Sequence, residues 1–211
     1  MKNISISVIK QSNYKNMPWK NGLGFTHQID IQPPGSSFPI GDAFSWRLSS
    51  ATVSRSSAFS LFPNCDRILV VWTGAGLLLN NTVKLERLKP YTFSGEEPIN
   101  CDIIGDTDVV DFGIIFRRDL VTATMSVRSF KVKPTGDQGL LSHEHVHHVD
   151  LVGPGFSYLT SIHGCFTVGE SEIELVNPGD TVAIHVEEAT IVKIVSSEEI
   201  MFFHVHVTPR N

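Results

Sequence analysis

The pattern that most constrains this fold is a long series of short, strand-like runs separated by Gly, Pro and Asn turns, with almost no window of helical spacing. β-Branched and aromatic residues alternate or cluster over a few positions and a turn then follows, which is typical of antiparallel sheets. Such runs cover residues 25–31, 44–51, 68–72, 76–79, 98–104, 109–116, 123–132, 157–162, 172–176, 181–184, 190–195 and 201–207. Regularly spaced strands with these corners predict an all-β sandwich or barrel.

The sequence also repeats itself weakly. Residues 68–74 (ILVVWTG) resemble residues 158–164 (YLTSIHG), Pro90 matches Pro178, and a shorter match follows. The offset stays near ~90 residues, which is too long for a solenoid repeat and suits two copies of a small β domain. We therefore predict two similar halves, 1–120 and 121–211, with an approximate boundary that allows a terminal strand of one half to join the other. The alternative is that short β segments resemble each other by chance.

Composition excludes several classes of partner. A net charge of −5 without a Lys/Arg cluster argues against nucleic acid and against an anionic membrane surface. No segment approaches the ~18 apolar residues that span a bilayer, and the first seven residues lack the apolar run of a signal peptide. Cys65, Cys101 and Cys165 have neither disulfide-framework nor metal-site spacing, which fits free thiols in a reducing compartment. We expect a cytoplasmic globular protein; a homodimer is left open.

One candidate binding segment is residues 17–26 (MPWKNGLGFT). It sets the indole of Trp19, the ammonium of Lys20 and the carboxamide of Asn21 beside two glycines that let a backbone approach a ligand closely. Thr26 follows at the start of a predicted strand. The alternative interpretation is a hairpin corner with a packed indole.

A second candidate lies on the predicted strand 44–51, where alternation puts Trp46 on one face and Arg47 and Ser49 on the other. A guanidinium that looks out from a face of small residues has room for a bidentate contact with a carboxylate. Arg67 ends the run before the next strand. Because a buried guanidinium needs an anion, we expect some of these cations to pair internally. The expected acidic partners are Asp66, which neighbours Arg67 in the sequence, and Asp111.

These segments together resemble the HutD/Ves family. The matching segments are residues 18–26 (PWKNGLGFT), 44–49 (FSWRLS), 59–67 (FSLFPNCDR), 73–76 (TGAG), 93–95 (FSG) and 111–118 (DFGIIFRR). The resemblance is specific over residues 14–119, and only cupin-like turns such as NPGDTVAI at 177–184 support it beyond. It implies a bicupin, that is, two cupin-like antiparallel β-barrels (jelly rolls) in one chain, with a ligand pocket in the N-terminal barrel.

The resemblance further implies a bacterial cytoplasmic protein that is encoded with histidine-degradation genes and tempers that pathway by sensing a small metabolite. It implies no catalytic activity. The chain departs from the family pattern at Leu23, which replaces a glycine of the triplet, and at Gly113, which stands where an Asn is common. Both departures bear on the pocket, so the identity of the ligand stays open.

Histidine is the competing clue, since all but one of the 9 histidines lie in the second half. Residues 143–148 hold four of them in a predicted polar loop, and the candidate metal ligands are His163, His185, His204 and His206. Imidazole and carboxylate ligands suit Fe, Mn, Ni or Zn in a cupin. However, the positions expected for the usual ligands hold Leu151, Gly153 and Ser157, and Arg67 stands at the first-half Glu position. We therefore expect no metal and no cofactor.

The preferred hypothesis is a metal-free, non-catalytic protein that binds a small carboxylate, with an intermediate of histidine degradation as one candidate. Lys20, Arg47 and Arg67 would attract the carboxylate, Asn21, Thr26 and Ser49 would hydrogen-bond it, and Trp19 or Trp46 would form an apolar wall. The alternative is a metal-dependent cupin enzyme that uses the second-half histidines. A purely structural partner protein is a third hypothesis.

Overall fold

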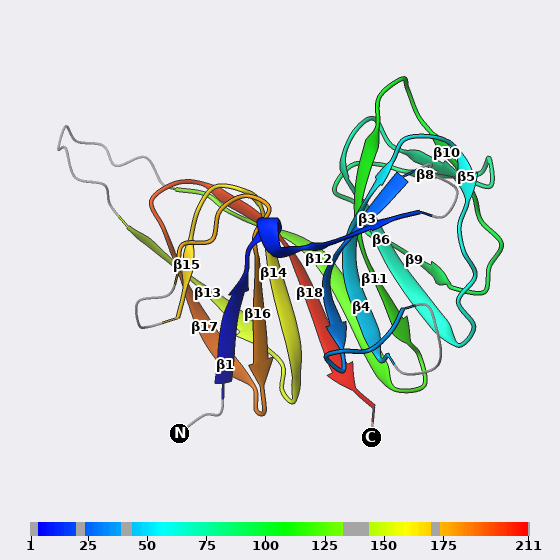
Figure 1. The fold of residues 1–211 in the computed structure, drawn as a ribbon. Helices are drawn as coiled ribbons and strands as arrows, with labels where there is room; N and C mark the ends of the chain where they lie inside the picture. The colour runs from blue at the N-terminus through cyan, green and yellow to red at the C-terminus, as the bar shows by residue number, and fades with distance from the viewer. Residues whose placement is uncertain (1–3, 20–23, 39–43, 133–143, 170–173, 211) are drawn as a thin grey trace. The chain divides into compact units, whose positions relative to one another are not determined.

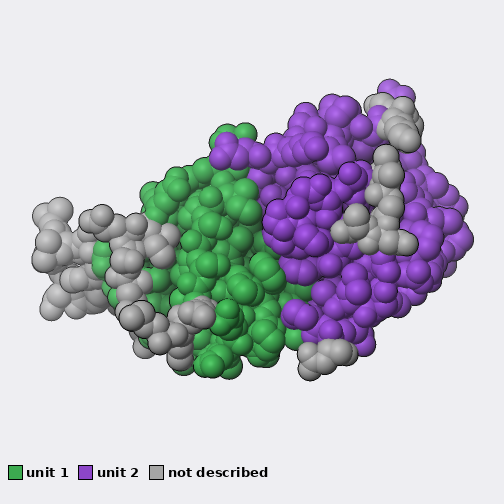
Figure 2. Space-filling view, turned by 60° about the horizontal axis from the view of Figure 1, so that its bottom comes forward, with its two compact units in different colours: residues 1–12, 125–208 green, residues 13–124, 209–211 purple. Residues whose placement is uncertain are grey.

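The computed structural model of the chain describes residues 4–19, 24–38, 44–132, 144–169 and 174–210 (Figure 1). These residues form strands β1 to β18 and one short 3-10 helix, η1 (Gln11–Asn13), and they contain no α-helix. The chain divides into two compact units, which Figure 2 distinguishes by colour. Unit 1 comprises Met1–Ser12 and Met125–Thr208, and unit 2 comprises Asn13–Thr124 and Pro209–Asn211. The predicted all-β class is confirmed.

Unit 2 contains two antiparallel sheets. The larger has the order β2 (Lys15–Pro18), β3 (Gly24–Gln32), β4 (Trp46–Val53), β11 (Val109–Arg117), β6 (Cys65–Thr73), β9 (Tyr91–Ser94). The smaller has the order β5 (Ser57–Ala58), β10 (Asn100–Ile103), β7 (Leu77–Leu79), β8 (Val83–Leu85). Leu69 and Val71 of the larger sheet share one buried cluster with Leu77 and Leu79 of the smaller, so apolar burial holds the two sheets face to face.

Unit 1 repeats the two-sheet arrangement. Its larger sheet has the order β1 (Ile4–Ile9), β16 (Thr181–Val186), β14 (Gly155–His163), β18 (Ile200–Pro209), β12 (Val121–Phe130). Its smaller sheet has the order β13 (His145–Leu151), β17 (Thr190–Ser196), β15 (Thr167–Val168). Leu159, Val182 and Phe202 from the first pack with Val149 and Ile194 from the second.

The strand pairings recur about 90 residues apart along the chain, as the weak sequence repeat predicts. In unit 2, β6 pairs with β9 and β11, and β7 pairs with β10. In unit 1, β14 pairs with β16 and β18, and β15 pairs with β17. A glycine with positive φ directly follows β6 and β14, Gly74 (98°) and Gly164 (74°) respectively, where a side chain would be strained.

Some elements differ from the sequence prediction. The expected polar loop at residues 143–148 is wrong from residue 145 onward, because strand β13 starts there and pairs residue for residue with β17. Histidines occupy both faces of β13, so its sequence lacks the alternation of polar and apolar residues that predicts a strand. Strand β1 was also not predicted, although Ile and Val alternate with Ser along most of it. In the predicted strand 172–176, the described part contains only an isolated bridge from Val176 to Phe166.

The N-terminal strand belongs to unit 1 because β1 pairs with β16 along its full length, and the residues after β1 also contact the turn before β16. Lys10 Nζ lies 3.2 Å from Asp180 Oδ2 and 3.0 Å from Glu174 Oε1, and the Gln11 N–H donates to Asp180 Oδ1 at 2.9 Å. Burial opposes ionisation of Asp180, but the backbone N–H groups of Gln11 and Asn177 and the Lys10 ammonium together lower its pKa.

No helix among the described residues is long and apolar enough to cross a membrane.

A cationic face inside unit 2

Strand register brings Arg47 and Arg67 onto the same face of the larger sheet of unit 2. Arg47 on β4 lies opposite Ile115 on β11, which lies opposite Arg67 on β6, which in turn lies opposite Phe93 on β9. Directly opposed residues on adjacent antiparallel strands point to the same side of a sheet. The two guanidinium groups therefore flank Ile115 on one face.

The next two rows along the same strands add further polar groups. Ser49 lies opposite Gly113 and Gln28, and Ala51 lies opposite Asp111 and Thr26. We call the polar residues Thr26, Gln28, Arg47, Ser49, Arg67 and Asp111 of these rows the arginine face. Lys15, opposite Gln28, and Arg117, opposite Cys65, lie on the same side of the sheet beyond these rows. The same face carries Leu69 and Val71, which pack on the smaller sheet. The arginine face is thus part of the interior of unit 2.

Arg47 is buried, with 5% of its surface exposed. Its Nε donates to Gln28 Oε1 at 3.0 Å, its Nη2 donates to Met17 Sδ at 3.3 Å, and its guanidinium lies 4.2 Å above the ring of Phe38. Burial, together with the positive charge of Arg67, lowers the pKa of Arg47 to about 10. Arg47 stays charged at neutral pH, yet no described carboxylate lies within ion-pair distance of it.

Arg67 is half-buried among aromatic rings. Its guanidinium carbon lies 4.6 Å from the ring centre of Phe59, 5.0 Å from that of Phe93 and 5.7 Å from that of Phe62. Burial lowers its pKa to about 10, although Asp111 acts in the opposite direction. The backbone of Arg67 pairs with β9 and β11, but its guanidinium forms no hydrogen bond or ion pair with any described residue. Cation–π contacts hold the Arg67 guanidinium in place, but its N–H donors have no acceptor among the described residues.

Asp111 is the acidic member of the arginine face and is 6% exposed. Its Oδ1 accepts a hydrogen bond from the Ala51 N–H at 3.0 Å, and its backbone carbonyl accepts one from Ser50 Oγ at 2.6 Å. Burial raises the pKa of Asp111 to about 7, with Arg67 and the Ala51 N–H opposing the rise. Both protonation states of this carboxyl are therefore populated near neutral pH.

Trp19 is tied to the arginine face through Thr26. Its Nε1 donates to Thr26 Oγ1 at 2.8 Å, and its backbone N–H donates to the Gly24 carbonyl at 3.0 Å. A Cβ at Gly24 would lie 3.1 Å from the Trp19 ring and 2.4 Å from the Thr52 carbonyl oxygen, so only glycine fits there. The other two residues predicted from this segment, Lys20 and Asn21, lie outside the described residues.

Trp46 does not belong to this group. It lies opposite Phe116 of β11 and Gln32 of β3, one position out of step with Arg47, so its side chain is on the other face of the sheet. The structure thus places four predicted residues, Thr26, Arg47, Ser49 and Arg67, on one face. Trp19 is hydrogen-bonded to one of them, and Trp46 lies on the other face and forms no wall beside them. The sequence did not predict Gln28 or the rings of Phe38 and Phe59 as members of the site. Alternation along strand 25–31 would have placed Gln28 on the same face as Thr26.

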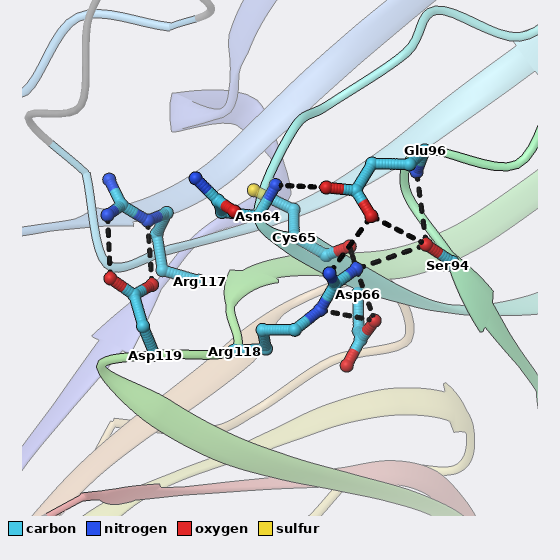
Figure 3. A network of polar contacts seen from close by, with 8 residues as sticks. All are labelled: Asn64, Cys65, Asp66, Ser94, Glu96, Arg117, Arg118 and Asp119. Atoms are coloured by element: carbon cyan, nitrogen blue, oxygen red, sulfur yellow. Dashed lines mark hydrogen bonds and ion pairs between the residues drawn. The ribbon is translucent and has the colours of Figure 1, made fainter.

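The expected pairing of Asp66 with Arg67 is wrong, because Asp66 pairs with Arg118 instead (Figure 3). Arg118 Nη2 lies 2.9 Å from Asp66 Oδ1, and Arg118 Nη1 lies 3.0 Å from Glu96 Oε2. Arg118 also donates to the Cys65 carbonyl at 2.6 Å and to Ser94 Oγ at 3.0 Å. Its charge is fully matched by acceptors, in contrast to those of Arg47 and Arg67.

Residues 11–150 match the model of the HutD family. The chain belongs to this family. It is 36% identical over 115 residues to an uncharacterised 21.2 kDa protein in the hutC 3′ region of Pseudomonas putida, a match that covers 53% of this chain and 58% of that protein. It is 31% identical over 122 residues to protein Ves of Cronobacter sakazakii, covering 54% and 63%. The matches therefore span less than two thirds of these relatives.

The fold of this HutD-family protein is similar to that of HutD from Pseudomonas fluorescens SBW25, solved under a formate condition. The TM-score is 0.75 at 23% sequence identity, and the likeness covers 98% of this chain and 100% of that chain. This likeness concerns the fold. Together with the family match, it confirms the HutD/Ves resemblance read from the sequence.

Of the four candidate histidines of this HutD-family protein, His204 and His206 meet at Ser157, whereas His163 and His185 lie elsewhere. His206 Nδ1 lies 2.8 Å from Ser157 Oγ, and His204 Nε2 lies 3.5 Å from the same oxygen. His185 instead packs against Phe156 on the opposite face, and His163 is exposed at the end of β14. Within the described ranges, no group of three or more His, Cys, Asp or Glu side chains could hold a metal ion.

Proposed function

We propose that this HutD-family protein binds a small carboxylate on the arginine face and serves as a metal-free, non-catalytic sensor in histidine utilisation. The observation that carries the proposal is the pair of desolvated guanidinium groups, Arg47 and Arg67, on one interior face without a described carboxylate in ion-pair contact. A buried cation without an anion is unfavourable, so an anionic ligand would complete the site.

The spacing of the two arginines suits a small anion. Strands β4 and β6 are separated by β11, so the Cα atoms of Arg47 and Arg67 are ~10 Å apart, at ~4.8 Å per strand. Arg47 is directed toward Gln28 and Met17, and Arg67 toward the rings of Phe59 and Phe93. Both side chains are long enough to turn from these contacts toward a common point above Ile115. A carboxylate there would accept charge-assisted hydrogen bonds from both groups, and the ring of Phe38 would border it.

We also propose that each unit is a closed, cupin-like barrel, so that the whole chain is a bicupin. A cytoplasmic location is a separate part of the proposal. The two sheets within each unit and the recurrence of their pairings support this description. A metal-dependent enzyme has less support, since His185 lies on the opposite face of the sheet from His204 and His206.

The test is a binding series with formate, formamide and the carboxylate intermediates of histidine degradation. Formamide matches formate in size but carries no charge. We expect a carboxylate at 100 times its Kd to stabilise the protein by about 2.7 kcal/mol in thermal or urea unfolding, and formamide to have no effect. The stabilisation should vanish in Arg47→Met. It should persist in Arg118→Met, because Arg118 of the parent already pairs with Asp66 and Glu96. Equal responses of both variants would contradict the proposal.

A further inference from the structure

We propose that carboxylate binding to the arginine face is coupled to the uptake of one proton by Asp111. This inference rests on the proposed function and adds its regulation by pH. It is carried by the placement of a buried carboxyl group on the same interior face as the two arginines.

Nothing on β11 separates Asp111 from the proposed anion. Asp111, Gly113 and Ile115 point to the same side of that strand, and Ile115 lies between Arg47 and Arg67. Gly113 has no side chain, and Leu69 Cδ1 lies 3.0 Å from the place that a Cβ would take there, so the side chain between the carboxyl and the arginine row is apolar and screens charge poorly. A ligand anion above Ile115 would lie close enough in the dry interior for its charge to act on Asp111.

The groups that face Asp111 leave its two protonation states closely balanced. From β6, Arg67 favours the ionised form, and from β4 the Ala51 N–H does the same. From β10, Cys101 adds no charge, since burial raises the pKa of its thiol to about 12. Burial favours the neutral form and brings the pKa of Asp111 to about 7. A second anion on the face would tip this balance toward the protonated carboxyl.

The proton balance of the step is simple. When Asp111 is ionised, the carboxylate ligand and one proton from solvent enter together, and Asp111 becomes a neutral acid. When Asp111 is already protonated, the ligand binds alone. By linkage, affinity for the anion must therefore fall as pH rises through the pKa of Asp111, and ligand binding must raise that pKa.

The experiment uses sodium formate as the probe and the full chain with 13C-labelled aspartate. NMR titration gives the Asp111 pKa with and without formate, and the formate Kd is measured at about pH 6 and about pH 8.5. We expect formate to raise the pKa and the Kd to be roughly fivefold weaker at the higher pH. In Asp111→Asn, whose amide oxygen can still accept from Ala51, the Kd should change less than about twofold between the two pH values.

Asp108→Asn is the matched control, because Asp108 is exposed just before β11 and should leave the parent's pH dependence unchanged. A formate Kd in the parent that is independent of pH, with an unchanged Asp111 pKa, would overturn the coupling and leave the proposed function intact. Absence of formate binding at every pH would instead contradict the proposed function. If Asp111→Asn fails to fold, the NMR titration of the parent still decides.

Discussion

Replacing Arg47 by Met should leave the ligand-free protein as stable as the parent or slightly more stable. Burial and the neighbouring charge of Arg67 lower the pKa of Arg47 to about 10. A difference of ~2–3 pH units from the ordinary arginine value corresponds to ~3 kcal/mol of unfavourable free energy for the charged form in the folded state. Met removes this charge and keeps most of the apolar side-chain volume.

Two favourable contacts are lost in the same substitution. The cation–π contact with Phe38 is worth roughly 1–2 kcal/mol in a desolvated site, and the hydrogen bond to Gln28 contributes about 1 kcal/mol. These losses offset most of the ~3 kcal/mol that is relieved. We expect a net change in unfolding free energy between zero and about 1 kcal/mol of stabilisation.

Urea unfolding at neutral pH, followed by tryptophan fluorescence in carboxylate-free buffer, measures this change directly. Arg118→Met is the control, because Arg118 has carboxylate, carbonyl and hydroxyl acceptors, and its loss should lower the unfolding midpoint. A loss of more than about 2 kcal/mol in Arg47→Met would refute the reasoning and assign Arg47 a structural role.

Further substitutions test other parts of the structure. Burial, with Arg128 and His206 contributing, lowers the pKa of His204 to about 4, so the unfolded chain takes up this proton at a higher pH than the folded protein does. The free energy of unfolding should therefore fall by about 3 kcal/mol as the pH drops from ~6.5 to ~4 and should not change through His204 above that range. Urea unfolding of His204→Gln should lack this pH dependence. Asp180→Ala leaves the Gln11 N–H without its acceptor and should destabilise the protein by about 2–3 kcal/mol in the same assay. A neutral result would mean that the Asp180 contacts contribute little beside the pairing of β1 with β16.

The sequence by itself determined the fold class and one face of the site. Alternation along 44–51 is a local property, and it correctly placed Arg47 with Ser49 and apart from Trp46. The turns and the ~90-residue repeat likewise indicated two β units, because glycine and proline corners act over a few residues. Strand β13 escaped because its histidines carry no clear polar or apolar pattern.

Only the tertiary structure decided which residues face Arg47 across the sheet. Arg67 and Asp111 reach its face through the register of β4, β11 and β6, and the hydrogen bond from Ala51 to Asp111 joins residues 60 positions apart. The sequence suggested that Asp66 pairs with Arg67, but successive residues on a strand point to opposite faces, so Asp66 meets Arg118 instead. Register is set by packing between distant strands, and no local pattern specifies it.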